Sequence, residues 1–531
     1  MDNRHRLMAH TAVSIICGLA VSGCTMSQPA ATEAVMRDEA SCLRLAGSEV
    51  SGTKIDSAVY VKTGTTVVDR PPFTLKSSSN FCRVAVTLSS APGSSIKTEY
   101  WLPDTWNNKF FAVGGGGFSG GLDSAALVLL GPVAEGYAGA ASDAGHPTVE
   151  GAQWAHNEPV KLADWADRAN HQTAVFGKSL IAAYYGEAPR RAYFEGCSNG
   201  GRDALTLVQK HPGDFDAIIS GAPAADWTGL MSSFVLNRKT MEAFGASGQQ
   251  AKFKIVNDAI MAKCDMADGV KDGVLEHPIA CKFDPSEVQC KAGETSNCLS
   301  KAEADALRTI YQGHPLADGR KVFAGFPPGA EADAGGWRDS SKGGTGQMGI
   351  DYFRWMVYGD ANWNPDQFKL DSDYAAAVER TGSIINANNP DITAFTRKGG
   401  KLLMWHGWND QLIAAGGTLD YYDAVKSKLG AGADQSVRLF MAPGVNHCFG
   451  GAGPSFWDKL GELDRWVETN TPPSRIIATK YESDLFKLIG MPTKALRTRP
   501  LCAWPQVARY NGSGSTDDAG NFTCALPAAA P

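Results

Sequence analysis

The stretch that decides the fold of this chain reads Arg191-Ala192-Tyr193-Phe194-Glu195-Gly196-Cys197-Ser198-Asn199-Gly200-Gly201. Its first five residues predict a strand, and residues 202–210 predict a helix. Between them lies the pattern G-x-S-x-G, a tight turn whose glycines avoid clashes and expose a serine hydroxyl at the edge of a sheet. The helix N-terminus behind this turn favours developing negative charge. A purely structural glycine turn is the alternative, but the strand–turn–helix context favours Ser198 as a nucleophile.

Other segments predict a parallel α/β sheet around this strand. Residues 110–113 form a short apolar run that stops at four glycines, and a buried strand that ends in a glycine-rich loop is typical of parallel sheets. Residues 165–185 have apolar side chains spaced by three and four, as a helix does. Further strands are predicted at residues 81–102, 215–220, 401–407 and 437–441.

A serine nucleophile needs a base that a third group holds in place, and in α/β-hydrolases the chain order is Ser, then Asp or Glu, then His. Of the ten histidines, His447 alone follows the strand that should carry the acid. Asp410 comes directly after the strand at 401–407, where it would accept the Nδ1 hydrogen of His447. The other acidic candidates fall in the next helix or loop: Asp420, Asp423 and Asp434. We therefore predict an α/β-hydrolase fold with Ser198, Asp410 and His447 as the catalytic residues.

The oxyanion that forms when serine attacks an ester needs N–H donors nearby. In this fold one donor is the N–H of the residue after the nucleophile, here Asn199, and the other comes from an earlier strand-end loop. Residues 114–117 supply such a loop, and we expect Gly116 and Gly117 to be the donors. A plain glycine-rich turn remains the alternative for this loop.

Size and charge bound the possible functions. The chain has 531 residues, 43% of them hydrophobic and 20% charged, with a net charge of −6. This charge gives no indication of nucleic-acid binding, which shows as a basic stripe. The length is too great for one simple core, and between residues 226 and 395 cysteines cluster and aromatic residues are frequent. We predict a large lid domain there, inserted between the nucleophile and acid strands, with residues 41–225 and 396–531 as the two parts of the catalytic domain.

The N-terminus resembles an export signal. Two arginines precede an apolar run at 12–21 that is too short to span a bilayer, so residues 1–24 predict a signal peptide. The run ends in Val21-Ser22-Gly23-Cys24, which resembles a bacterial lipobox and would attach Cys24 to a membrane through lipid. Ordinary signal cleavage nearby is the alternative. Residues 25–40 look like a tether, and we expect an exported protein that is periplasmic, anchored to the outer membrane or secreted.

Ten cysteines lie outside the signal region. An even number in an exported protein indicates disulfides rather than free thiols. The spacing does not fit a tetrahedral zinc site, because the sequence contains no C-x2-C pair. Sequence alone leaves the pairing open among Cys42, Cys82, Cys197, Cys264, Cys281, Cys290, Cys298, Cys448, Cys502 and Cys524.

Taken together, these motifs resemble the tannase/feruloyl esterase family, which also includes mono(hydroxyethyl) terephthalate hydrolase. The family's hallmark is a cysteine beside the catalytic serine and another beside the catalytic histidine, here Cys197-Ser198 and His447-Cys448. The resemblance covers nearly everything after about Cys42. Further matching stretches are Trp106-Asn107-Asn108-Lys109, Gly444-Val445-Asn446-His447-Cys448 with Gly450-Gly451, Arg499-Pro500-Leu501-Cys502 and Pro505-Gln506-Val507-Ala508-Arg509-Tyr510.

The resemblance implies five disulfides and one metal ion. The implied disulfides are Cys42–Cys82, Cys197–Cys448, Cys264–Cys281, Cys290–Cys298 and Cys502–Cys524. The implied metal is a structural Ca²⁺ in the lid, held by carboxylates of Asp265, Asp268 and Asp272 and by carbonyls of Val270 and Val274, the hard oxygen ligands that Ca²⁺ prefers. The spacing is not that of an EF-hand loop. Without the resemblance, this segment reads as two Asp-Gly turns.

By the same resemblance, the chain is a serine carboxylic-ester hydrolase that acts on esters of aromatic acids and needs no organic cofactor. We place feruloyl and related phenolic esters first, galloyl esters second and the terephthalate monoester third. Lid aromatics would stack on a planar acyl group, although most of them are expected to be lid core: Trp227, Phe234, Phe323, Phe326, Trp337, Tyr352, Phe353, Trp355, Tyr358 and Trp363. Two rivals are an α/β-hydrolase peptidase, disfavoured by the cysteine-flanked triad, and a non-catalytic surface lipoprotein that binds phenolics, disfavoured by the complete triad.

Overall fold

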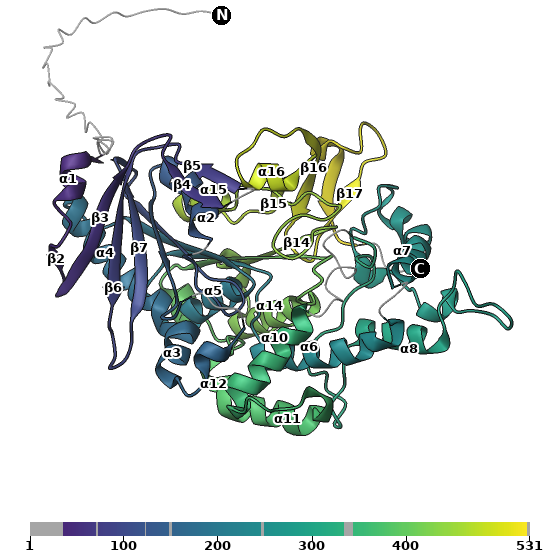
Figure 1. Ribbon diagram of the computed structural model, residues 1–531. Helices are drawn as coiled ribbons and strands as arrows, with labels where there is room; N and C mark the ends of the chain where they lie inside the picture. The colour runs from purple at the N-terminus through teal and green to yellow at the C-terminus, as the bar shows by residue number, and fades with distance from the viewer. Residues whose placement is uncertain are drawn as a thin grey trace, which may run out of the picture. The chain divides into compact units, whose positions relative to one another are not determined.

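The predicted nucleophile turn follows a central strand of a ten-stranded sheet (Figure 1). The computed structural model describes residues 35–70, 73–122, 124–147, 151–245, 249–333 and 344–527. Six neighbouring strands are parallel, in the order β14 (Val437–Ala442), β13 (Lys401–Gly407), β12 (Ala217–Gly221), β11 (Arg191–Cys197), β9 (Lys109–Val113) and β10 (Ala138–Ser142). The sheet continues in antiparallel pairing through β7 (Ile96–Pro103), β6 (Phe81–Leu88), β3 (Thr53–Val61) and β2 (Glu49–Val50). This sheet confirms the predicted α/β-hydrolase fold.

Strand β11 lies between two parallel neighbours because its side chains are apolar on both faces. Phe194 pairs with Ala112 of β9 on one side and with Ile218 of β12 on the other. Every residue of β12 and of β13 is buried, as expected for strands that helices cover on both faces. Because these strands are parallel, the carboxyl ends of β11, β13 and β14 meet at one edge of the sheet. The predicted nucleophile, acid and base follow these three strands.

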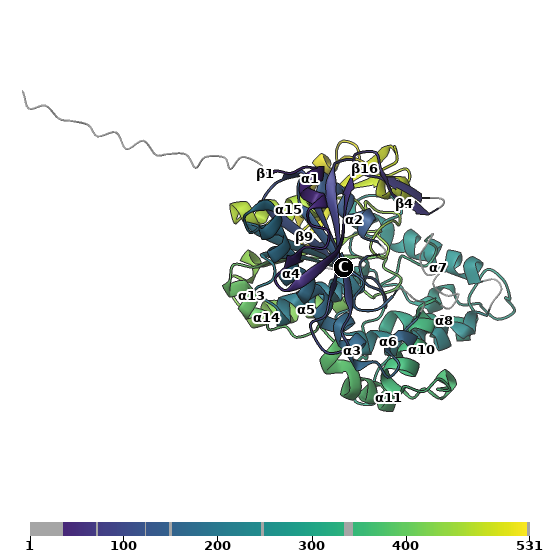
Figure 2. The same cartoon turned by 60° about the vertical axis from the view of Figure 1, so that its left-hand side comes forward.

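Helices cover both faces of the sheet and bury a separate apolar core on each. On one face, Leu129 of α2 (Ala125–Ala134) and Trp466 of α15 (Lys459–Thr469) are buried in the same cluster. On the other face, the buried cluster includes residues of α4 (Ala169–Tyr185), α5 (Asn199–Lys210) and α14 (Gly416–Leu429). Helices α5 and α14 lie side by side in both views (Figure 1, Figure 2). The helix that follows the nucleophile turn is therefore buried on the second face.

The strand predicted at residues 81–102 is two strands. β6 ends at Leu88, and β7 begins at Ile96 and runs antiparallel to it. The chain reverses through a turn that contains Pro92-Gly93, where Gly93 has a φ of +82°. Alternation of apolar residues continues on both sides of the turn, so the periodicity did not show the reversal, whereas the Pro-Gly pair is a turn signal.

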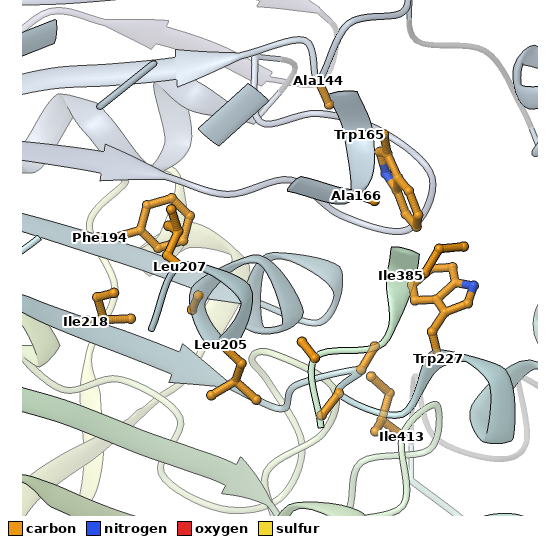
Figure 3. Packing of buried hydrophobic residues seen from close by; sticks show 14 of the residues in the cluster. Ala144, Trp165, Ala166, Phe194, Leu205, Leu207, Ile218, Trp227, Ile385 and Ile413 are labelled. Carbon is orange, nitrogen blue, oxygen red and sulfur yellow. The ribbon is translucent and has the colours of Figure 1, made fainter. Parts of the chain in front are cut away.

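The segment between β12 and β13 is the predicted insertion, and it is mainly helical. Its helices are α6 (Trp227–Met241), α7 (Gln249–Cys264), α8 (Lys301–Gln312), α10 (Gly344–Asp351), α11 (Leu370–Ala377), α12 (Ser383–Ile385) and α13 (Thr393–Arg397). Figure 3 shows Trp227 and Ile385 of the insertion near Trp165, and the rings of Trp165 and Trp227 are 5.1 Å apart. The insertion therefore shares a continuous apolar core with the rest of the chain. It belongs to the same compact unit, Val35–Pro531.

Short elements outside the ten-stranded sheet and the insertion complete the unit. The predicted signal peptide at 1–24 and Cys24 lie outside the described residues. The predicted tether at 25–40 extends too far, because β1 (Val35–Met36) already pairs with β8 (Thr105–Trp106) and a helix begins at Glu39. The remaining elements are α1 (Glu39–Leu43), α3 (Pro159–Ala163), α16 (Asp484–Leu488) and the hairpins β4 (Thr66–Arg70)–β5 (Phe73–Lys76), β15 (Arg475–Tyr481)–β16 (Ala495–Cys502) and β17 (Val507–Tyr510)–β18 (Phe522–Ala525). In the part of the chain that the structure describes, no helix has the length and apolar character needed to cross a membrane.

Candidate active site

Ser198 sits in a strained turn between β11 and α5. Its φ of +65° is in the left-handed region, which costs free energy for a residue with a side chain. The turn closes only because its neighbours are glycines. A Cβ on Gly196 would lie 2.2 Å from the carbonyl oxygen of Gly200, and a Cβ on Gly200 would lie 2.7 Å from that of Gly115. The turn thus places Ser198 against the glycine loop that follows β9.

Asp410 and His447 come together at the ends of β13 and β14. Nδ1 of His447 lies 2.7 Å from Oδ2 of Asp410, and Nε2 of His406 lies 3.2 Å from the same oxygen. The other carboxylate oxygen accepts hydrogen bonds from the N–H groups of Leu412 and Ile413, both at 2.8 Å. Burial opposes ionisation of Asp410, but the charge of His447 and the hydrogen bonds from His406 and His447 outweigh it and hold its pKa well below the ordinary value. Asp410 is therefore a buried carboxylate suited to orient His447.

Ser198 and His447 line the same cavity, which has a volume of about 500 Å³. Gly116 and Gly117 also line it, whereas Asp410 does not and lies behind His447. The side chain of His447 is 13% exposed, so it is accessible from the cavity. The structure thus brings the predicted nucleophile, the predicted base and the glycine loop to one hollow.

Some backbone N–H groups near Ser198 donate a hydrogen bond within the protein, and others do not. In the loop after β9, the N–H of Gly114 donates to the carbonyl of Glu195 at 3.0 Å, and the N–H of Gly115 donates to Asp203 at 3.3 Å. Within the described parts of the chain, the N–H groups of Gly116, Gly117 and Asn199 make no hydrogen bond. These three are the N–H groups that the sequence singled out.

A disulfide joins the turn of the nucleophile to the loop of the histidine. Cys197 and Cys448 are 251 residues apart, their Cα atoms lie 6.0 Å apart, and both line the cavity. The other four disulfides are Cys42–Cys82, Cys264–Cys281, Cys290–Cys298 and Cys502–Cys524. All five are the pairs that the resemblance implied.

Most residues of the cavity wall were not predicted from the sequence. Two of the predicted lid aromatics, Trp227 and Phe234, line it, while others, such as Phe353 and Trp363, stack on each other within the insertion. Trp337 lies outside the described residues. The missed wall residues are mainly aliphatic or Met and come from distant segments: Leu127, Val128, Leu230, Met231, Met348, Leu412, Ile413, Phe449 and Leu488. Apolar side chains of this kind carry no motif that separates a cavity wall from core.

The predicted calcium ligands lie in a loop rich in buried oxygen atoms. Asp265 is buried, and its carboxylate accepts from the N–H of Gly273 at 3.1 Å. Burial, joined by the charges of Asp272 and Asp265, raises the pKa of Asp268 to about 6. Val270 and Val274 are buried, and their carbonyl oxygens accept no hydrogen bond from the residues that the structure describes. Carbonyl oxygens without partners and nearby carboxylates are the hard ligands that Ca²⁺ prefers, but the three carboxylates do not all bring an oxygen atom within 4.8 Å of one another.

A second group of possible metal ligands lies away from the cavity. Among the described residues, His171, His211 and Asp214 alone bring three such atoms within 4.8 Å of one another. The two imidazole rings are stacked at 3.9 Å and nearly parallel, and each is hydrogen-bonded to a carboxylate, His171 to Asp214 and His211 to Asp167. A metal ion must lie in the plane of each imidazole that binds it, so these stacked rings do not suit a shared ion as they stand.

Comparison with known proteins finds a matching family, related sequences and related structures. The model of a family described as tannase and feruloyl esterase matches residues 82–525. The chain is 33% identical to an uncharacterized esterase of Xanthomonas campestris pv. campestris, over 91% of each protein. It is also 33% identical to a probable feruloyl esterase of Arthroderma benhamiae, over 92% of this chain and 94% of that protein. Among solved structures, feruloyl esterase B from Aspergillus oryzae is similar with a TM-score of 0.81 and 26% identity, over 92% of this chain and 99% of that one.

Proposed function

This chain belongs to the tannase and feruloyl esterase family and is a carboxylic ester hydrolase, and from that premise we propose that it cleaves esters of aromatic phenolic acids through an acyl-enzyme on Ser198. Feruloyl and related hydroxycinnamoyl esters are the proposed substrates. The observation that carries the proposal is the shared cavity, in which Ser198 and His447 lie in a largely apolar wall.

The proposed mechanism uses the arrangement around His447. His447 takes the proton of Ser198 Oγ as this oxygen attacks the ester carbonyl carbon. The N–H groups of Asn199, Gly116 and Gly117 stabilise the resulting oxyanion. The bond to the alcohol breaks, and His447 returns the proton to the leaving alcohol. Water then attacks the acyl-enzyme with His447 again as the base, the acid leaves, and Ser198 regains its proton. Asp410 stays ionised and stabilises the protonated imidazole.

The wall of the cavity supports an apolar acyl group. Trp227 and Phe234 offer aromatic contacts, and Leu230, Met231 and Met348 provide adaptable apolar surface. No lysine or arginine is among the described residues that line the cavity. A feruloyl group buries a planar ring and few polar atoms, whereas a terephthalate monoester brings a carboxylate and a galloyl group brings three hydroxyls that each need a partner.

The test is hydrolysis of methyl ferulate, methyl gallate and mono(hydroxyethyl) terephthalate by the purified protein, with Ser198→Ala as the control. We expect the highest kcat/KM for methyl ferulate and no turnover by the variant. A preference for the gallate or the terephthalate ester would reassign the acyl group. Absence of Ser198-dependent release from any of the three esters would contradict the proposed function.

We also propose that Ca²⁺ is held by the carboxylates of Asp265, Asp268 and Asp272 and the carbonyls of Val270 and Val274. The ion would supply positive charge that offsets the carboxylates of the loop and would draw them together; it has no role in the chemical step. Two arginines reach this loop from β16, since Arg497 and Arg499 both donate to Oδ2 of Asp272. These contacts offset the charge of Asp272 through its Oδ2 atom, so Asp265 and Asp268 would supply most of the negative charge that faces the cation.

Finally, we propose that the protein is exported and anchored through a lipid on Cys24. The five disulfides support export, because such bonds persist in oxidising compartments outside the cytosol. Mass spectrometry of the mature N-terminus from the native host tests this proposal. A mature chain that begins downstream of Cys24, or an unmodified Cys24, would contradict lipid anchoring.

A further inference from the structure

Two charged residues lie directly beneath the nucleophile turn. Arg202 has no exposed surface and Asp203 is 4% exposed, and Nη2 of the arginine donates to Oδ1 of the aspartate at 2.7 Å. Removing two charges from water is costly, and an apolar pair of similar size often stabilises a fold as well or better. Fold stability alone therefore does not account for this pair, and its other contacts are informative.

Asp203 holds the glycine loop that follows β9. Its Oδ2 accepts the N–H of Gly115 at 3.3 Å, which leaves the next two N–H groups of the loop free at the cavity. The loop lies directly on the start of α5, because a Cβ on Gly114 would be 2.8 Å from Cα of Gly200 and 3.2 Å from Oδ2 of Asp203. The carboxylate thus fixes the distance between this loop and the nucleophile turn.

Arg202 holds the nucleophile turn and the insertion. Its Nε donates to Oδ1 of Asn199 at 2.7 Å, and its Nη1 donates to the carbonyls of Ala166 at 2.8 Å and Ile385 at 3.2 Å. The guanidinium carbon lies 4.4 Å from the centre of the Trp165 ring. Figure 3 shows Trp165, Ala166 and Ile385 close together on one side of the packed core. One planar, rigid group therefore ties Asn199 to two other segments, the one that contains Trp165 and Ala166 and the one that contains Ile385.

We propose that Arg202 and Asp203 are positioning residues that align the oxyanion donors with Ser198. Asp203 positions the glycine loop, and Arg202 positions Asn199. As a result, N–H groups from two chain segments converge on the oxyanion. Neither side chain lines the cavity, so the pair acts through these backbone groups and not on the substrate. A donor displaced by about 1 Å costs on the order of a hundredfold in rate. This inference rests on the proposed function, since it requires an oxyanion at Ser198.

The first test is Asp203→Asn. An asparagine has one acceptor oxygen, so it cannot serve both Arg202 and the N–H of Gly115. We expect kcat for p-nitrophenyl acetate to fall about 100-fold with KM within about threefold, because the lost interaction acts only in the transition state. Affinity for phenylboronic acid, which forms a tetrahedral anionic adduct with an active serine, should fall by a similar factor. A purely structural role would not move these two measurements together.

The matched control is Asp464→Asn. It breaks a second ion pair that is less deeply buried, in which Nζ of Lys109 lies 2.6 Å from Oδ1 of Asp464, on the face of the sheet that α15 covers. We expect kcat and boronate affinity within about twofold of wild type. If Asp203→Asn does not fold, Arg202→Lys is the second variant. It keeps a positive charge beside Asp203 but loses the contact with Asn199. It should lower kcat about tenfold at unchanged KM.

Two outcomes would overturn the inference. One is a folded Asp203→Asn protein, or a folded Arg202→Lys protein where the first does not fold, whose kcat and boronate affinity match wild type. The other is a change in KM alone. Either result, beside wild-type hydrolysis that depends on Ser198, would remove the positioning role and leave the proposed function intact. Wild-type protein without Ser198-dependent hydrolysis would instead contradict the proposed function.

Discussion

Asp410 is the residue on which the candidate site depends most. Four groups surround its carboxylate: the imidazoles of His447 and His406 and the N–H groups of Leu412 and Ile413. A fully buried carboxylate with this many donors stays ionised and cannot rotate freely. It therefore sets the tautomer of His447, which decides whether Nε2 is free to accept a proton.

We predict that Asp410→Asn lowers kcat for p-nitrophenyl acetate about 10⁴-fold while the protein stays folded. An asparagine can present its NH₂ group to Nδ1 of His447 and so stabilise the wrong tautomer, an effect of about this size in a serine protease. The control is Asp423→Asn, which changes an exposed aspartate that the sequence left as a candidate acid. Equal losses in the two variants, measured in stopped assays with circular dichroism as a check of folding, would count against Asp410 as the acid.

At the scale of elements, loops carry the candidate catalytic residues, and the strands before these loops hold them in place. Asp410 and His447 follow buried parallel strands, so their loops start from fixed points on one edge of the sheet. The insertion lines the cavity with residues of α6 and α10, such as Phe234 and Met348, and its loop at 265–274 contains the predicted calcium ligands. The positions of the parallel strands along the chain were predictable because buried strands and the nucleophile turn have local signatures, whereas their order in the sheet was not predicted. The packing of the insertion was not predictable, since its helices have no comparable pattern.

Removal of the proposed Ca²⁺ should destabilise the loop at 265–274. We expect EGTA to lower Tm by about 5 °C, and Ca²⁺ but not Mg²⁺ to restore it, because a ligand at 100 times its Kd stabilises by about 2.7 kcal/mol. The shift should disappear in Asp265→Asn. Asp318→Asn, at another Asp-Gly turn of the insertion, should keep the shift. A wild-type Tm that does not respond to EGTA, together with no bound metal in elemental analysis, would rule out the ion.

A buried acid in the insertion should make stability depend on pH. Burial, with a smaller contribution from the charge of Asp333, raises the pKa of Glu331 to about 7, and Oε1 accepts from the hydroxyl of Tyr311 at 2.5 Å. A raised folded-state pKa means that this stability is complete below the unfolded pKa of about 4.3 and is lost as pH rises through about 7.

Glu331→Gln removes the titrating group while keeping the shape of the side chain. We therefore predict that Tm of the wild type falls more steeply between pH 5 and pH 8 than Tm of the variant, with a difference on the order of 3 kcal/mol in unfolding free energy. Thermal unfolding followed by fluorescence in matched buffers measures the difference. Parallel curves for the two proteins would show that Glu331 does not titrate in this range.

At the scale of the whole molecule, one covalent bond unites the two halves of the site. Cys197 and Cys448 close a loop of 251 residues that includes the entire insertion. In the chain-entropy model, a loop of this length stabilises by about 5 kcal/mol, against about 2.5 kcal/mol for the short loop closed by Cys290 and Cys298. The bond therefore limits how far the loops that follow β11 and β14 can separate, and it holds Ser198 and His447 at one cavity.

We predict that Cys197→Ala/Cys448→Ala lowers kcat about 100-fold with a modest change in KM, since the reacting groups lose their alignment. Cys290→Ala/Cys298→Ala, a pair within the insertion and away from the cavity lining, should keep kcat within about twofold. Kinetics at a temperature where both proteins are folded distinguish alignment from stability. Full activity in the first variant would show that the disulfide has no positioning role.

The sequence by itself determined the local chemistry of this protein and the order of its parts. The turn around Ser198, the loop with His447 and the strand before Asp410 are readable because each depends on neighbours within a few residues. The tertiary structure alone decided which side chains form the cavity wall, such as Leu127 and Leu488, and that Asp203 holds Gly115. Those contacts join segments far apart in the chain. They depend on how the sheet and the insertion pack together, and neither periodicity nor motifs in the sequence indicate that packing.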